Sequence, residues 1–242
     1  MTAPTARVGR VADYLCDGVA ALPGDDLAEE IGAWLAESGR FLAFAEANRD
    51  KIRKKLRTAN EPGTRGDVRA ELETAFRLLA DRRFDLAFEA YGSGNRGPDF
   101  TITFRASHKF NLEVTRPRVR DNDAGAGAAF GGPLLGKLRQ LPADAPNAIL
   151  LAGPLAASVA EVEANVRVLK LQADRGDERF FAARGLTAKE FQTLHRRMAM
   201  LMVGNAVGNG VHAWLNPEAR RRLPDGAANA CVTALAAARW RD

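Results

Sequence analysis

The sequence predicts an α/β fold in which a central mixed β-sheet is flanked by helices and preceded by an N-terminal helical arm. Three short segments with alternating apolar residues, FDLAFEAY, FTITF and FNLEV, follow one another between residues 84 and 114, as in antiparallel strands joined by turns. The apolar segment at 147–153 shows no alternation, which is typical of a strand buried on both faces. Helical patterns surround these segments, so we expect helices on the faces of the sheet.

The composition indicates a globular protein with a positive net charge. The 242 residues are 46% hydrophobic, and no apolar run is long enough for a transmembrane helix, so no membrane partner is expected. The N-terminus shows no secretory signal, and two cysteines without metal-ligand spacing favour a reducing, cytoplasmic setting. The net charge of +5 and the pI near 9.5 suit a polyanionic partner such as DNA or RNA, although an arginine-rich composition alone gives the same balance.

A segment rich in Pro and Gly, EPGTRGD at 61–67, predicts a loop between two parts of the chain. The segment before it has helical patterns, and the segment after it carries the strands. We therefore divide the chain into an N-terminal helical arm, residues 1–66, and an α/β domain, residues 67–242.

Two helices of the α/β domain have recognisable starts. Asp67 is the expected N-cap of the first, and on its helical wheel Glu71 lies at the edge of the apolar stripe, where it can face a neighbouring element. Glu73 lies farther round the wheel and is expected to face water. A capping box, TAKE, opens a second helix that the pattern predicts over 187–203.

The last two alternating segments predict a hairpin with two acids on one face. With a turn centred near residue 107, Asp99 lies opposite Thr115, and Glu113 lies opposite Thr101. The period of two places Asp99 and Glu113 on the same polar face, where neighbouring side chains are about 5 to 8 Å apart. An Asp solvated in a turn and a Glu solvated on a strand remain the alternative.

Two carboxylates at that separation can share one divalent cation. Magnesium commonly binds proteins through one or two carboxylates, with water and substrate phosphate completing its shell. Such an ion polarises a phosphate and lowers the pKa of the attacking water. The pattern therefore indicates a phosphodiesterase that depends on Mg²⁺ or Mn²⁺.

The order of features between residues 67 and 153 resembles a known family. A helix with an inward Glu is followed by a strand, a glycine-rich turn, Pro98-Asp99 at a strand start, a hairpin, Glu113 and an α/β crossover. This order is similar to that of the PD-(D/E)XK nuclease superfamily, which includes many restriction endonucleases and resolvases. The resemblance implies a restriction-endonuclease-like core and a nuclease that processes DNA.

The resemblance also implies roles for particular residues. Asp99 and Glu113 would bind the metal together with the backbone carbonyl of Val114. Glu71 would match the acid that some members place on the first helix, where it supports a metal or a water. A homodimer is expected by analogy with enzymes that cut both strands of a duplex.

The sequence departs from the family at position 115, where Thr115 replaces the lysine that orients or deprotonates the attacking water. Lys137 could supply the charge from the next helix, whereas Lys109 lies about 13 Å from Glu113 along the strand. Thr115 could hydrogen-bond the water or a metal ligand, and a metal-bound water could need no lysine. The remaining alternative is a catalytically inactive module that binds nucleic acid or protein with the same fold.

Overall fold

The chain forms two compact units in the computed structural model. Contacts divide it into Met1–Arg82 and Arg83–Asp242, so the helix that we expected to open the α/β domain groups with the N-terminal helices. The structure describes residues 3–91, 97–117, 132, 134–153, 159–205 and 210–236.

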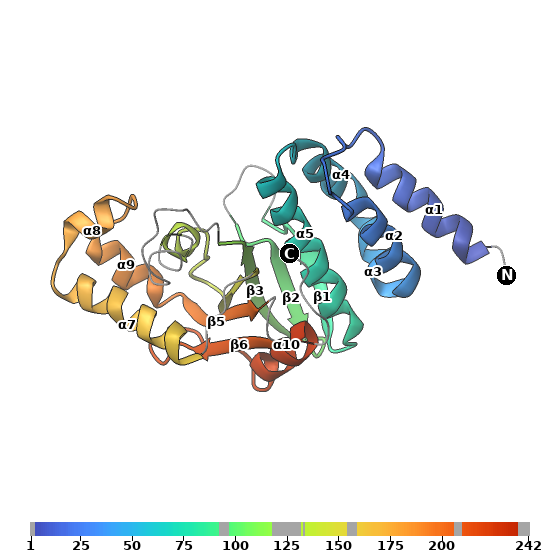
Figure 1. Ribbon diagram of the computed structural model, residues 1–242. Helices are drawn as coiled ribbons and strands as arrows, with labels where there is room; N and C mark the ends of the chain where they lie inside the picture. The colour runs from blue at the N-terminus through green and yellow to red at the C-terminus, as the bar shows by residue number, and fades with distance from the viewer. Residues whose placement is uncertain are drawn as a thin grey trace. The chain divides into compact units, whose positions relative to one another are not determined.

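The first unit is helical throughout its regular structure (Figure 1). Its helices are α1 (Ala3–Cys16), α2 (Leu27–Glu37), α3 (Gly39–Ala47), α4 (Arg49–Thr58) and α5 (Pro62–Ala80). An aromatic cluster contributes to its core, because Trp34 on α2 stacks on Phe76 of α5 at 5.7 Å between ring centroids and meets Phe41 of α3 edge-on. Such pairs add to the stabilisation that comes from burial of apolar area.

Helix α5 begins five residues before the predicted N-cap Asp67. Pro62 occupies the first turn, where a missing N–H leaves no hydrogen bond unmade, and Glu61 and Thr64 form a capping box. The segment 61–67 is therefore mostly helix rather than loop. Proline and glycine were misleading there because proline is favoured at the start of a helix.

Burial on several sides of α5 also overturns the prediction that Glu73 faces water. Glu73 is 8% exposed and forms an ion pair with Arg77, one turn along the helix. Burial raises the pKa of Glu73 and lowers that of Arg77, and the pair opposes both shifts. The helical wheel failed because it assumes one apolar face, whereas α5 buries residues around most of its circumference.

The second unit contains a six-stranded mixed sheet in the order β1-β2-β3-β4-β5-β6, which confirms the predicted α/β class (Figure 1). Its strands are β1 (Phe84–Phe88), β2 (Phe100–Phe104), β3 (His108–Thr115), β4 (Asn147–Leu151), β5 (Met198–Asn205) and β6 (Gly210–Leu215). Strand β4 pairs in parallel with β3 and β5, and the other neighbours are antiparallel. Every residue of β4 is buried, as its unbroken apolar pattern predicted.

Helices cover the sheet. The elements are α7 (Val159–Asp174), α8 (Glu178–Ala182), α9 (Ala188–His195) and α10 (Ala227–Ala236), with a short helical stretch at 134–138. That stretch shares one apolar core with α7, α8 and α9, and this core contains Ile149 and Leu201. Because Ile149 is paired with Glu113 in β3, the core covers the face of the sheet that carries the acid.

The predicted helix over 187–203 is only half correct. Its capping box is present, with Thr187 accepting from the N–H of Glu190, but α9 ends at His195 and β5 begins at Met198. The sequence MAMLMV in β5 consists of apolar residues without alternation, several of which favour helices, so periodicity cannot separate the two states. Parallel pairing with β4 makes this segment a strand.

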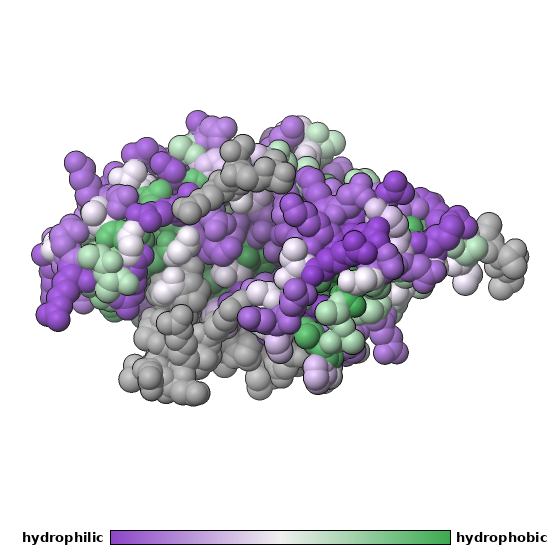
Figure 2. Space-filling model, turned by 90° about the horizontal axis from the view of Figure 1, so that it is seen from above, coloured by the Kyte–Doolittle hydropathy of each residue, from purple (hydrophilic) through white to green (hydrophobic). Residues whose placement is uncertain are grey.

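The surface is largely polar where it can be seen. Figure 2 shows one face on which hydrophilic residues cover most of the area and apolar residues show in small patches. Within the described part of the chain, none of the helices has the length and apolar character needed to span a bilayer.

Acid is expected to destabilise the second unit through His195. This ring is 2% exposed and lies between Phe191 and Trp214, and burial, aided by the charges of Lys170 and Arg196, lowers its pKa to about 4. The unfolded chain takes up a proton below about pH 6.5, so stability present above that pH is lost as the pH falls toward 4.

The free energy of unfolding should fall by about 2 kcal/mol less in His195→Phe than in the wild type between about pH 7 and about pH 4.5. Urea unfolding at both pH values measures this difference. His212→Phe, at an exposed position on β6, is the matched control and should follow the wild type. An unchanged acid loss in His195→Phe would contradict the assignment.

Candidate functional site

The β2–β3 hairpin brings Asp99 and Glu113 together, but in a register that differs from the predicted one. Phe104 pairs with His108 and Phe100 with Leu112, so the turn is centred on residue 106 rather than 107. Continuing this register places Glu113 beside Asp99 rather than opposite Thr101, whose partner is Asn111. A three-residue turn with positive φ at Arg105 and Ala106 causes the change.

Backbone N–H groups hold both carboxylates in place. The N–H of Asp99 donates to Oε2 of Glu113 at 3.2 Å, and the N–H of Val114 donates to Oδ2 of Asp99 at 2.8 Å. Each acid is thus fixed by the strand that carries the other acid. The two side chains therefore form one unit rather than two independent surface groups.

Lys137 reaches this pair from the stretch 134–138. Its Nζ lies 2.5 Å from Oε1 of Glu113. Leu134, Leu135 and Leu138 are buried in the core described above and anchor the stretch against the sheet. The lysine side chain is 27% exposed, whereas the Glu113 side chain is 1% exposed, so the ammonium lies between the buried acid and solvent.

Burial makes Glu113 a weak acid. Its pKa is raised to about 7, first because burial disfavours the carboxylate and then because Asp99 is negatively charged. Lys137 and the N–H of Asp99 act in the opposite direction. Glu113 can therefore gain or release a proton near neutral pH, which is a property of acid–base groups at functional sites.

Pro98 leaves one backbone acceptor of this site without its usual donor. Continuing the register from Phe100 and Leu112 by two residues brings Pro98 opposite Val114. Proline has no N–H, so the ladder bond that the Val114 carbonyl would accept from that position cannot form. The arrangement suits a carbonyl that takes part in ligand binding.

A row of neutral polar side chains lies next to the acids on the same face. Asn111 accepts from Thr101 and donates to Asn147 across β3 and β4, and it also contacts the hydroxyl of Tyr91. No motif in the sequence marks these residues as part of a site. An Asn at the start of the apolar run NAILL was the available signal, because a buried amide needs polar partners.

The other predicted site residues have different surroundings. Thr115, at the end of β3, is partly exposed, and its carbonyl accepts from Ala152 at 2.8 Å. Glu71 belongs to α5 in the first unit, where Lys55 lies 2.5 Å from it. Lys109 is exposed and pairs with Thr103 near the hairpin turn, so it lies toward the other end of β3.

Carboxylates occur here as a pair rather than as a larger cluster. Among the described residues, no group of three or more His, Cys, Asp and Glu side chains is arranged to hold a metal ion. A cation at this site would therefore need backbone carbonyl, water or substrate oxygens in addition to Asp99 and Glu113.

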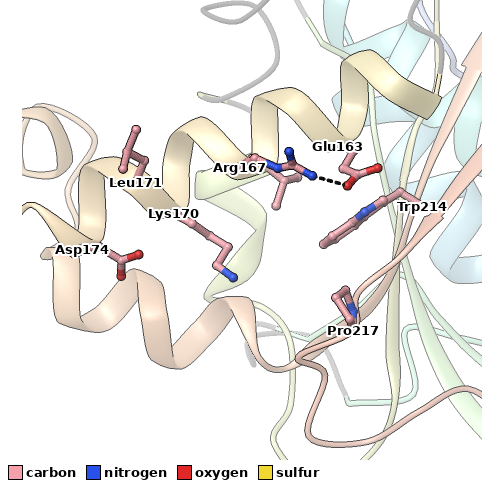
Figure 3. Close-up of a pocket in the computed structure, with 8 residues that line it drawn as sticks. Glu163, Arg167, Lys170, Leu171, Asp174, Trp214 and Pro217 are labelled. Atoms are coloured by element: carbon pink, nitrogen blue, oxygen red, sulfur yellow. Dashed lines mark hydrogen bonds and ion pairs between the residues drawn. The ribbon is translucent and has the colours of Figure 1, made fainter.

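A separate hollow of about 340 Å³ lies between α7 and the end of β6 (Figure 3). Trp214 and Pro217 form one side, and Arg167 and Lys170 come from α7. Both cations are paired with acids, Arg167 with Glu163 at 2.7 Å and Lys170 with Glu218. Because acids already balance both cations, this hollow is a weaker candidate than the Asp99–Glu113 pair.

Comparisons with protein-family models, with curated proteins and with solved structures find no match for this chain.

The raised pKa of Glu113 has a consequence for stability. The folded protein binds a proton there between about pH 4.5 and about pH 7, where the unfolded chain does not, so this contribution to stability is lost as the pH rises through that window. The free energy of unfolding of Glu113→Gln, taken relative to that of the wild type, should therefore increase by about 2 kcal/mol between pH 5 and pH 8. Urea unfolding at both pH values measures the difference. Glu163→Gln, which removes an acid from an exposed ion pair, is the control. If the stability difference between Glu113→Gln and the wild type were the same at both pH values, the raised pKa of Glu113 would be contradicted.

Proposed function

We propose that the second unit is a metal-dependent nuclease that hydrolyses phosphodiester bonds, with DNA as the expected substrate. The observation that carries the proposal is the joint placement of Asp99, Glu113 and Lys137. Phosphodiester hydrolysis requires a positively charged environment for the phosphate and a route for the proton of the attacking water. A carboxylate pair with an adjacent ammonium provides groups for both needs.

The donor groups fit a small divalent cation. Asp99, Glu113 and the carbonyl of Val114 would hold Mg²⁺ or Mn²⁺, which commonly uses one or two carboxylates and completes its shell with water and phosphate. When bound, such an ion polarises the phosphate and lowers the pKa of the attacking water. A shared cation would also relieve the repulsion by which Asp99 raises the pKa of Glu113.

The protein groups have complementary tasks in this proposal. Lys137 stabilises negative charge that develops on the phosphate and occupies the role left open by Thr115. Glu113, whose pKa is raised to about 7 by burial and by Asp99, would give up its proton when the cation binds and would hold the cation as a carboxylate. The Thr115 hydroxyl, on the same face as Glu113, orients the water. A cytoplasmic setting and a homodimer that acts on both strands complete the proposal.

One observation favours a second candidate, a catalytically inactive nucleic-acid-binding or protein-interaction module. Both oxygens of Glu113 already have donors, one in Lys137 and one in the N–H of Asp99. Metal binding at Glu113 would have to replace or share these contacts.

Metal binding and cleavage test the nuclease proposal together. We expect Asp99→Asn to weaken Mn²⁺ binding about tenfold or more in calorimetry, because a charged ligand is lost.

Glu113→Gln should lower Mg²⁺-dependent cleavage of plasmid DNA about 10²-fold or more. Lys137→Met should keep Mn²⁺ affinity close to the wild-type value and still lose cleavage, because its ammonium acts on the reacting phosphate.

Lys109→Met is the matched control for the lysine, because it removes an exposed ammonium from β3 and should retain cleavage. Unchanged Mn²⁺ affinity in Asp99→Asn, or cleavage that survives Glu113→Gln, would refute the nuclease proposal. Salt-dependent DNA binding without cleavage by the wild type would support the inactive module instead.

Pro98 provides a test of the backbone ligand. Pro98→Ala introduces an N–H opposite Val114, and we expect it to occupy the carbonyl and weaken Mn²⁺ binding several-fold in calorimetry. Pro224→Ala, in the loop before α10, controls for the added flexibility of the unfolded chain. Full metal affinity in a folded Pro98→Ala protein would exclude the Val114 carbonyl as a ligand.

A further inference from the structure

Three segments near the start of β4 and β5 carry an excess of positive charge. They are the loop 139–146, the segment 187–197, which consists mainly of α9, and the loop 216–223 after β6, and they lie far apart in the sequence. Together they contain seven Lys and Arg residues and three acids, in a chain whose whole net charge is +5. We refer to this region as the basic patch.

Hydrogen bonds from two asparagines hold the three segments together. The side chain of Asn147 donates to the carbonyls of Pro142, Ala145 and Arg197, which joins the first segment to the second. The side chain of Asn216 donates to the carbonyl of His195, which joins the third segment to the second. Buried contacts therefore fix the backbone positions from which the charged side chains extend.

Contacts of the arginines themselves tighten the arrangement. The N–H of Arg220 donates to the carbonyl of Arg196 at 2.8 Å, and Nε of Arg221 donates to the carbonyl of Ala143 at 3.2 Å. Arg196 and the run Arg220–Arg222 are exposed. Their guanidinium groups are thus at the surface near the C-terminal end of α9.

A hollow of about 370 Å³ lies within the patch. Arg139, Lys189 and Arg197 line it together with the hydroxyl-bearing Thr187 and Thr193 and the acid Glu190, which pairs with Arg139. Among the described residues, the buried Nε of Arg197 has no hydrogen-bond partner, although Nη1 of the same side chain donates to the carbonyl of Leu141.

We propose that the basic patch binds the phosphate backbone of nucleic acid. Six of its seven cations are arginines, whose planar groups donate two parallel hydrogen bonds to a phosphate. Threonine hydroxyls are also common phosphate contacts. The acids of the patch balance only part of its positive charge. Glu190 pairs with Arg139 inside the patch, whereas Glu218 pairs with Lys170, which lies outside it.

The patch lies close to the proposed catalytic pair. Asn147 is hydrogen-bonded to Asn111, and Glu113 follows Asn111 two residues later on the same face, a span of about 7 Å. Both asparagines are buried, so this link connects the two places through the interior, and we expect one nucleic-acid duplex to contact both at the surface. In that respect the inference rests on the proposed function, although phosphate binding by the patch does not require catalysis.

Salt-dependent binding tests the patch without cleavage. Anisotropy of a fluorescein-labelled 20-base-pair DNA duplex is measured in EDTA at several KCl concentrations. The variant Arg220→Gln/Arg222→Gln removes two exposed cations, and each lost phosphate contact lowers the slope of log K against log salt by about 0.9. We expect a shallower slope and an affinity at least about tenfold weaker at 0.1 M KCl.

The control Arg167→Gln/Arg175→Gln removes the same charge from α7 and the turn after it, and it should bind as the wild type does. No salt-dependent binding by the wild type, a patch variant equal to the wild type, or equal losses in both variants would overturn the inference. The inference would also be overturned if the patch variant lost binding to phosphatidylcholine/phosphatidylglycerol vesicles while its DNA binding stayed intact. Thermal melting confirms that each variant is folded.

The same assay separates the two proposals. If metal binding and cleavage fail while the patch variant loses DNA affinity, only the nuclease proposal falls. If cleavage follows expectation and the patch variant binds normally, only the inference about the patch falls.

Discussion

The parallel pairing of β3 with β4 is the constraint on which the candidate site depends. Parallel neighbours cannot be joined by a tight turn, so the chain must cross over one face of the sheet between them. The helical stretch 134–138 lies in that crossover and packs on the same face as Glu113. Burial of the acid and the approach of Lys137 are therefore two consequences of one topological requirement.

Glu113 and Glu73 are two buried acids that differ in their charged neighbours. Both are buried, both have a raised pKa, and each contacts a cation. Glu73 is balanced by Arg77 on its own helix. Glu113 has a second acid beside it in addition to its cation, and that acid contributes to raising its pKa. Burial alone would not distinguish a structural pair from a functional one.

The charges of the second unit are organised by neutral polar residues. Asn111 and Asn147 connect β3 to β4 next to Glu113, while Asn147 and Asn216 join the segments of the basic patch. Amides suit this role because they satisfy several backbone groups without adding charge to a buried place. A change at Asn147 would therefore affect both the acid pair and the patch.

The sequence by itself determined the α/β class, the alternating faces of β2 and β3, the buried strand β4 and the common face of Asp99 and Glu113, because period-two patterns depend only on local side-chain order. Tertiary structure decided the rest. The turn shifted the hairpin register by two residues, which keeps the faces and changes the partners. Pairing with β4 made a strand of the apolar segment after His195, and only folding brought together the arginines of three distant segments. Such contacts depend on residues remote in sequence, so no local pattern records them.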